Sequence, residues 1–178
     1  MSYFRSLPGE GTIRDIFRQY PEVFAPWGET TEQIMNGPAP LNRAERELIG
    51  AYVSALNACG FCYGVHGGIA QAWGLQPGLL ESLVEDVDSA DLDDKFKVLL
   101  KYVRKLTLTP SRMTQGDVDT VLAAGWDEQA LQFAIFVACR FAFMNRLVDA
   151  YGIPALDEAG ARAVAGHFVE HGYRGVER

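Results

Sequence analysis

The sequence predicts an all-α protein, a bundle of about eight helices. Three observations support this class. Apolar residues between the prolines and glycines recur at helical spacing, alternating strand patterns are almost absent, and helix-capping residues precede several of the periodic segments. No internal repeat, low-complexity tract or long linker divides the 178 residues, so we expect one domain over residues 1–178.

The first forty residues are the least regular part of the chain. The stretch TIRDIFRQYPEVFAPWGETTEQIM predicts two short helices, broken near Pro21 and Pro26, with two later prolines ending the second, Pro38 and Pro40. We therefore expect residues 1–40 to form an irregular N-terminal helical arm. Residues 41–154 would form the core of the domain.

The core opens with two helices in succession. In LNRAERELIGAYVSAL, Asn42 is placed to cap a helix, with Glu45 as its capping-box partner. A second helix is expected to begin near residues 57–59 and to continue through CYGVHGGIAQAWG. The glycines in that segment lower its helix propensity and indicate close packing against a neighbour.

Further helices are predicted in the second half. Pro77 lies near a helix start, and Thr114 and Gly125 are placed to cap and close a short helix. DLDDKFKVLLKYVRKLTL is amphipathic, with one apolar stripe formed by Phe96, Leu99, Leu100, Val103 and Leu106. The most apolar segment, DEQALQFAIFVACRFAFMNRLVDAYG, predicts a central helix, and DEAGARAVAGHFVEHG predicts the last one.

Composition excludes several classes of protein. A hydrophobic content of 48% with mean hydropathy −0.02 is typical of a soluble globular domain. The net charge of −7 disfavours nucleic-acid binding, which needs a basic face. No apolar run approaches the roughly 20 residues that cross a bilayer, and the N-terminus lacks a signal-like apolar segment. We therefore expect a cytoplasmic protein with no membrane association, whose thiols are held reduced.

The segment NACGFCYGVHGG holds the candidate chemistry. On a helix, Cys59 and Cys62 lie about 60° apart around the axis, and His66 lies about 40° from Cys62, one turn further on. The three side chains therefore share a face. Cysteines at a helix N-terminus meet unpaired backbone N–H groups and the positive end of the helix dipole, which favour the thiolate. This pattern favours a redox-active pair.

Other interpretations of the pair remain open. Tyr63 follows the second cysteine where c-type haem attachment requires histidine, so that reading is excluded and no cofactor is expected. A reducing compartment disfavours a structural disulfide. A metal site formed by Cys59, Cys62, His66 and a carboxylate stays an alternative, as do two buried cysteines without chemistry.

Glu47 is the candidate proton acceptor, twelve residues before Cys59. A straight helix over residues 47–62 would separate Glu47 from Cys62 by about 22 Å. Contact therefore requires a break near Asn57, which is a good helix cap beside the flexible Gly60.

The pattern E-x11-C-x2-C-x3-H resembles the active-site motif of alkylhydroperoxidase D-like (AhpD-like) proteins of the carboxymuconolactone decarboxylase superfamily. It is formed by Glu47, Cys59, Cys62 and His66. LNRAERELIGAYVSALNACGFCYGVHG resembles that family's core helix pair, and FAFMNRLVDAYGIP resembles a segment of its peroxidase-related branch. The resemblance extends over residues 41–154 and is specific around the cysteines.

The resemblance implies an AhpD-like helical bundle that assembles as a homo-oligomer, a dimer, trimer or hexamer. It also implies a cycle between dithiol and disulfide that reduces hydroperoxides at the expense of a dithiol or thioredoxin-like reductant. Cys62 would attack the peroxide, Cys59 would resolve the sulfenic acid, and Glu47 and His66 would relay protons. Phe61 departs from the pattern, because the family's best-known peroxidases carry a histidine there.

Two rival functions also follow from the sequence. One is a metal-binding or non-catalytic helical oligomer. The other is a redox sensor or disulfide reductase without significant peroxidase turnover. Decarboxylation is not expected, since the superfamily's decarboxylases lack the cysteine pair.

The remaining polar and sulfur-containing residues predict ordinary structural roles. Cys139 lies among apolar neighbours and is expected in the core. Asn145 and Arg146 end the same apolar helix and could line the site, although the expected role is to cap the helix or to pair at the surface. His167 and His171 are expected to be solvated, and the three tryptophans to serve packing.

Overall fold

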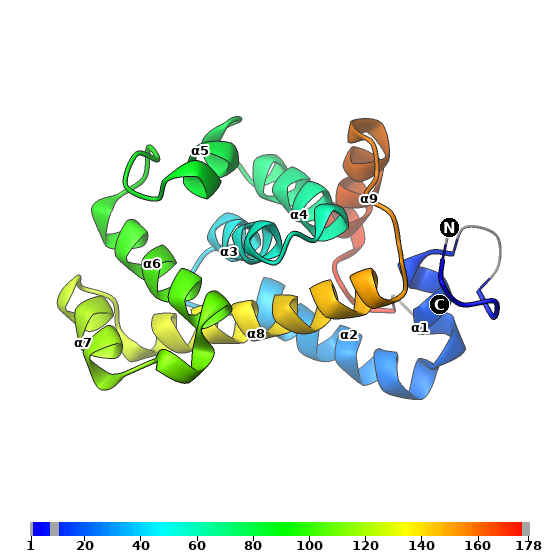
Figure 1. Ribbon diagram of the computed structural model, residues 1–178, viewed down its shortest axis with the longest axis horizontal. Coiled ribbons are helices and arrows are strands. Elements are labelled where there is room, and N and C mark those ends of the chain that lie inside the picture. Colours follow the sequence, from blue (N-terminus) through cyan, green and yellow to red (C-terminus); the bar gives the residue numbers. More distant parts are fainter. Residues whose placement is uncertain (1, 8–10, 176–178) are drawn as a thin grey trace.

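The computed structural model describes residues 2–7 and 11–175, and within these ranges it contains nine α-helices, one 3-10 turn and no strand (Figure 1). The predicted all-α class is confirmed. In chain order the elements are α1 (Ile13–Gln19), α2 (Pro21–Asn36), α3 (Arg43–Leu56), α4 (Gly60–Ala72), α5 (Leu79–Glu85), α6 (Asp94–Leu108), the 3-10 turn η1 (Pro110–Arg112), α7 (Gln115–Ala123), α8 (Glu128–Ala150) and α9 (Glu158–His171).

Local sequence signals place most of these boundaries. Asn42 and Glu45 form the predicted capping box of α3, with the Asn42 side chain accepting from the Glu45 N–H at 2.9 Å. Thr114 and Asp117 form the same motif at α7, and Gly125 ends that helix with φ +93°. These caps satisfy backbone N–H groups that the first turn of a helix leaves unpaired.

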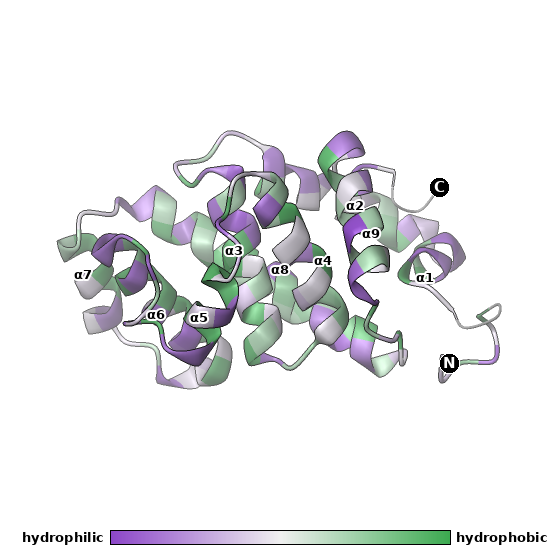
Figure 2. Cartoon of the chain, turned by 90° about the horizontal axis from the view of Figure 1, so that it is seen from above, coloured by the Kyte–Doolittle hydropathy of each residue, from purple (hydrophilic) through white to green (hydrophobic). Residues whose placement is uncertain are grey.

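α3 is the helix around which the others pack. It contacts α4 on one side and α8 on another, and α5 and α6 also pack against it. α9 lies along α4, and α2 runs beside α8 (Figure 1). Nine consecutive residues of α3, from Arg46 to Ser54, are buried, which is why it forms the centre of the bundle. Coloured by hydropathy, the helices carry both apolar and polar residues, and much of α4 and α8 in the middle of the molecule is apolar (Figure 2).

A second apolar cluster places the N-terminal helices beside the cysteine pair. Ile16 and Phe17 of α1 and Phe24 of α2 pack in the same buried group as Cys59 and Cys62. Met144 and Val148 of α8, with Leu7 and Ile153, complete this cluster. Residues far apart in the sequence therefore surround both sulfur atoms with apolar groups.

The predicted break at Pro26 is wrong. Pro21 occupies the first position of α2, as expected, but the helix continues through Pro26 to Asn36. A proline inside a helix costs about 3 kcal/mol. Burial of Phe24 and Met35 on one face of α2 contributes roughly 1.5–3 kcal/mol each, which offsets that cost.

The sequence analysis expects no segment long and apolar enough to cross a membrane, and α8 is an exception to that expectation. Within the described residues it is the one helix that is long and apolar enough by length and composition. Half of its most apolar window is buried inside the bundle, however. The central helix of a globular domain has the same properties, so this finding is weak support for membrane insertion.

Gly50 allows α3 and α8 to approach closely. A Cβ at this position would lie 2.2 Å from the ring of Phe141, which is fully buried. Gly166 of α9 gives a matched comparison, since no atom lies within 4 Å of the position that its Cβ would take. The two glycines are both helical, but only the first is required by packing.

We expect Gly50→Ala to destabilise the protein by roughly 1–3 kcal/mol, because Phe141 must move to make room. Gly166→Ala should instead stabilise it by about 0.5–1 kcal/mol through helix propensity. Urea unfolding of both variants measures the difference. A stable Gly50→Ala variant would show that the α3–α8 contact is looser than described.

Candidate active site

A tight turn between α3 and α4 reverses the chain just before the cysteines. Asn57 ends α3, Ala58 adopts a left-handed conformation with φ +58°, and Cys59 is the N-cap of α4. Ala58 is the one non-glycine residue with positive φ in the described ranges. The Cys59 N–H donates to the Ser54 carbonyl at 2.9 Å, which fixes the turn. The predicted break at Asn57 is confirmed.

The two cysteine side chains lie together at the start of α4, where one thiol can donate to the sulfur of the other. Cys59 is fully buried and Cys62, in the first turn of the helix, is 3% exposed. A hydrogen bond from Cys59 lowers the pKa of Cys62, and Arg140 and Asn145 lower this pKa further. Burial acts in the opposite direction and raises it. The same hydrogen bond, together with burial, raises the pKa of Cys59. Cys62 is therefore the sulfur that ionises first, with the Cys59 thiol as its donor.

Glu47 and His66 meet between α3 and α4. The Glu47 carboxylate oxygen Oε2 lies 2.7 Å from His66 Nδ1. Its other oxygen, Oε1, accepts the phenol O–H of Tyr173 at 2.5 Å. Glu47 is 1% exposed, and each of its carboxylate oxygens has a protein partner, as a buried charge requires. Tyr173 follows α9, and the site thus joins three separate parts of the chain.

His66 is held by rings as well as by the carboxylate. Its imidazole packs edge-on against Phe141, with ring centroids 4.4 Å apart. Burial lowers the pKa of His66, while Glu47 raises it and Arg140 lowers it further. Burial also raises the pKa of Tyr173 well above its ordinary value. The resting site therefore favours a neutral imidazole and a neutral phenol next to Glu47.

Asn145 is a site residue that the sequence analysis placed wrongly. It is 1% exposed rather than at the surface. Its amide donates to Ser54 Oγ at 3.0 Å and its carbonyl accepts from Asn57 Nδ2 at 2.9 Å. A further hydrogen bond to Cys62 favours the thiolate. Asn145 thus ties α8 to the α3–α4 turn and to the sulfur at once.

Cys139 was also placed wrongly. It is exposed rather than in the core, on the same outward face of α8 as Phe136 and Phe143. The helix carries apolar residues on every side, so the sequence does not show which face turns inward. Arg146 is exposed and donates to the Ala142 carbonyl of the same helix.

A small cavity of about 40 Å³ brings part of the predicted site together. Cys62 and His66 line it, whereas Cys59 and Glu47 do not. Its other walls include residues that the sequence analysis did not select for the site: Arg140 and Met144 of α8, Trp27 and Thr31 of α2, and Tyr173. Cys62 therefore faces a space that a small group can enter, while Cys59 and Glu47 lie behind it.

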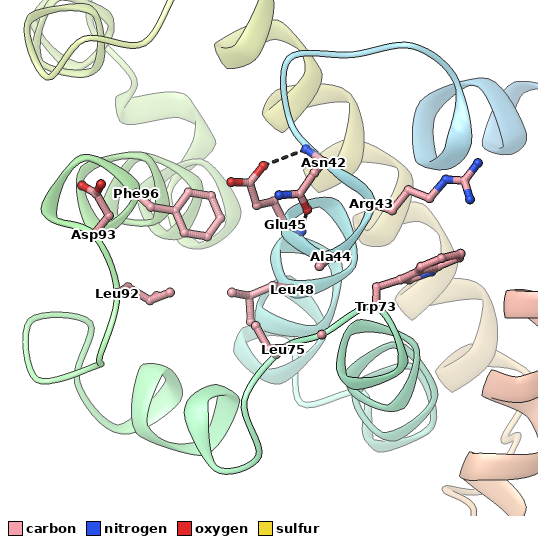
Figure 3. A pocket seen from close by; sticks show the side chains of 11 residues that line it. Asn42, Arg43, Ala44, Glu45, Leu48, Trp73, Leu75, Leu92, Asp93 and Phe96 are labelled. Carbon is pink, nitrogen blue, oxygen red and sulfur yellow. Dashed lines mark hydrogen bonds between the residues drawn. The ribbon is translucent and has the colours of Figure 1, made fainter.

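A wider groove lies at the other end of the α3–α4 pair. It has a volume of about 550 Å³ and is lined by Asn42, Arg43, Trp73, Leu75 and Phe96, among others (Figure 3). The guanidinium of Arg43 lies 5.0 Å from the centre of the Trp73 ring. Since α3 has 14 residues, its two ends are about 20 Å apart. This groove is therefore separate from the cysteine pair.

The metal alternative gains no support from the described residues. Across residues 2–7 and 11–175, no three histidine, cysteine or acidic side chains lie together as ligands. His167 and His171 are both exposed on α9, and Arg14 contacts the Nε2 atom of His167 at 2.6 Å.

The fold and the site define an all-helical protein with a buried pair of thiols at the start of α4 and, one turn after Cys62, an imidazole bonded to a carboxylate. Residues 21–105 match the model of the carboxymuconolactone decarboxylase family, so the resemblance predicted from the motif is confirmed. The matched region includes all four predicted site residues. No curated protein matches the sequence.

Solved structures share the fold over most of the chain. An uncharacterized peroxidase-related protein from Silicibacter sp. TM1040 is 24% identical with a TM-score of 0.76, covering 82% of this chain and 76% of its own. An uncharacterized peroxidase-related protein from Ralstonia eutropha JMP134, described as an alkylhydroperoxidase AhpD core, is 20% identical with a TM-score of 0.75. That match covers 83% of this chain and 78% of the Ralstonia chain. The predicted AhpD-like architecture is confirmed.

The hydrogen bond between the cysteines predicts how Cys62 titrates. In a Cys139→Ser background, the rate of Cys62 alkylation by iodoacetamide should rise with pH at a midpoint below that of an ordinary thiol. Cys59→Ala removes the donor, so the pKa of Cys62 rises and the midpoint moves to higher pH. Cys59→Ser keeps an O–H donor and should shift the midpoint less. Equal midpoints in all three proteins would contradict the pairing.

Proposed function

We propose that the protein is a thiol-dependent peroxidase that reduces hydroperoxides by cycling Cys59 and Cys62 between dithiol and disulfide. The observation that carries the proposal is geometric: Cys59 and Cys62 begin α4, and Cys62 lines one cavity with His66, whose Nδ1 lies 2.7 Å from Glu47 Oε2. Only the cysteine with the lowered pKa, Cys62, lines the cavity. A thiolate that a small molecule can reach, next to a protonated thiol, is what peroxide reduction requires.

The proposed reaction has three steps. The Cys62 thiolate attacks the terminal oxygen of a hydroperoxide R–O–OH, so that an S–O bond forms, the O–O bond breaks and RO⁻ leaves. Cys59 then attacks the sulfur of the resulting sulfenic acid, which forms the disulfide and releases water with the Cys59 proton. A dithiol donor reduces the disulfide and is itself oxidised, which returns both cysteines to the thiol state.

Protons move through His66 in this scheme. Its Nδ1 faces Glu47, which leaves Nε2 to accept the proton of Cys62 and to pass it to the departing RO⁻ as the alcohol. Glu47 stabilises the imidazolium that forms in between, with Tyr173 holding the second carboxylate oxygen. Phe61 provides no proton, so the relay consists of one imidazole and its carboxylate.

Stoichiometry tests the proposal directly. With excess cumene hydroperoxide and no reductant, each wild-type chain should consume one equivalent of peroxide, lose two thiols and form a Cys59–Cys62 disulfide. With dithiothreitol present, the wild type should reduce the peroxide repeatedly. Cys62→Ser should lose this reaction. Cys59→Ser should stop as a sulfenic acid that dimedone traps at Cys62. Cys139→Ser, changed at an exposed cysteine, should match the wild type.

Two outcomes would count against a peroxidase. Unchanged peroxide consumption by Cys62→Ser would rule out the assigned nucleophile. Reversible dithiol–disulfide exchange with no peroxide reaction would favour a redox sensor or disulfide reductase. The homo-oligomer, the dithiol reductant in the cell and the cytoplasmic location stay predictions.

Glu47→Gln tests the proton relay. The amide keeps the size of the side chain but removes the charge that raises the pKa of His66, so this pKa should fall further. We expect peroxide reduction to slow by roughly 10- to 100-fold, with the acidic limb of its pH profile moving to lower pH. Glu45→Gln, two residues earlier on α3, preserves the capping box and should leave both rate and profile unchanged. An unaltered profile in Glu47→Gln would exclude the relay.

A further inference from the structure

Arg140 is a buried cation that no carboxylate neutralises among the described residues. It lies on α8, is 7% exposed and forms no ion pair there. Its guanidinium carbon lies 4.4 Å from the ring centre of Phe141 and 5.3 Å from that of Tyr173. The Nε and Nη1 groups are both buried, and neither has a hydrogen-bond partner in the described part of the chain. Buried donors without a partner are destabilising, so packing alone does not explain them.

Two residues of α2 have the same property. The Trp27 indole N–H and the Thr31 hydroxyl are buried and find no partner among the described residues. Comparable side chains elsewhere are satisfied, since Trp126 donates its indole N–H to a backbone carbonyl at 2.8 Å. The Thr30 hydroxyl likewise donates to the backbone carbonyl one turn earlier, at 2.9 Å. The Thr31 hydroxyl makes no such bond. Apart from the Tyr52 hydroxyl, which lies in the main core, the unpaired buried side-chain groups of the described residues gather in one place.

That place is the cavity that Cys62 faces. Arg140, Trp27 and Thr31 all line it, and its volume of about 40 Å³ admits roughly two or three water-sized groups. The remaining walls are largely apolar and include Phe17, Phe61, Met144 and Val148. A few polar donors in an otherwise apolar pocket are typical of sites that orient a small ligand.

The charges around Arg140 favour a group that becomes negative. Cys62, His66, Glu47 and Tyr173 are the titratable groups that interact with it or lie in the same network. The imidazole and the phenol favour their neutral forms, and Glu47 is already bonded to both of them. Once Cys62 has passed its proton to His66, its thiolate is the anion that Arg140 stabilises.

We propose that Arg140, Trp27 and Thr31 form a subsite that binds the peroxide group of an organic hydroperoxide and stabilises the oxygen that leaves. The proposal rests on the peroxidase function proposed above. During the attack, negative charge moves from the Cys62 sulfur to the RO⁻ oxygen as the O–O bond breaks. Donors that are fixed and unpaired beforehand can receive this charge without reorganising.

Two reactions of Cys62 distinguish peroxide binding by the subsite from an effect of Arg140 on the ionisation of Cys62. Oxidation by cumene hydroperoxide needs the subsite, whereas alkylation by iodoacetamide needs only the thiolate. Both rates are measured at a pH above the Cys62 titration of each variant, where the thiolate is fully formed. We expect Arg140→Met to slow the oxidation by roughly 10²–10³-fold and to leave the alkylation at the wild-type rate.

Matched variants complete the experiment. Arg140→Lys keeps the charge but loses the planar donors, so its oxidation rate should fall between those of the wild type and Arg140→Met. Trp27→Phe and Thr31→Val each remove one donor and should slow oxidation by roughly 2- to 10-fold, which tests the subsite even if Arg140→Met fails to fold. Arg146→Met, at an exposed arginine of the same helix, should change neither rate.

Three results would overturn the proposal. If Arg140→Met slows both reactions equally, Arg140 acts through the thiolate or the fold. If oxidation keeps its wild-type rate in Arg140→Met, or in both Trp27→Phe and Thr31→Val, the donors do not contact the peroxide. A wild type that is alkylated at Cys62 but never oxidised by peroxide would instead contradict the peroxidase function itself.

Discussion

The reversal of the chain between α3 and α4 is the constraint on which the site depends. Ala58 adopts a left-handed conformation that costs roughly 1 kcal/mol for a residue with a side chain. In return, α4 folds back along α3, and the Glu47 carboxylate meets His66 at 2.7 Å. Without the turn, one continuous helix would separate Glu47 from His66 by about 28 Å. Short-range backbone geometry thus creates a long-range contact.

Burial gives this contact its chemical consequences. In water a carboxylate, an imidazole and two thiols would titrate almost independently, because solvent screens their interactions. Inside the bundle each group must find a partner or give up its charge. His66 and Tyr173 both bond the Glu47 carboxylate, and burial lowers the pKa of His66. The pKa of Cys59 is raised, so this thiol keeps its proton and can donate to Cys62. The arrangement gives two chemically identical thiols different pKa values.

α8 and α2 form part of the cavity that Cys62 faces. The inward face of α8 carries Asn145, bonded to the α3–α4 turn, and Arg140, whose unpaired donors line the cavity. α2 contributes two further donors, Trp27 and Thr31, to the lining of the same cavity. The sulfur chemistry therefore comes from one short motif, and the space in front of it comes from two helices far away in the sequence.

The sequence by itself determined the helices and the motif. Capping residues such as Asn42 and Thr114 act within one turn, so they mark helix starts wherever the helix packs. The spacing of Cys59, Cys62 and His66 fixes their common face for the same reason, and Asn57 marked the turn. The motif also pointed to Glu47, although only through its resemblance to a family pattern.

Only the tertiary structure decided which of the other residues belong to the site. α8 is apolar on nearly all sides, so its sequence does not reveal that Cys139 faces outward while Arg140 and Asn145 face the sulfur. Tyr173 lies 126 residues from Glu47 along the chain, and no local pattern predicts their hydrogen bond. Periodicity reports the existence of a helix, but its rotation and its partners follow from how all the helices pack together.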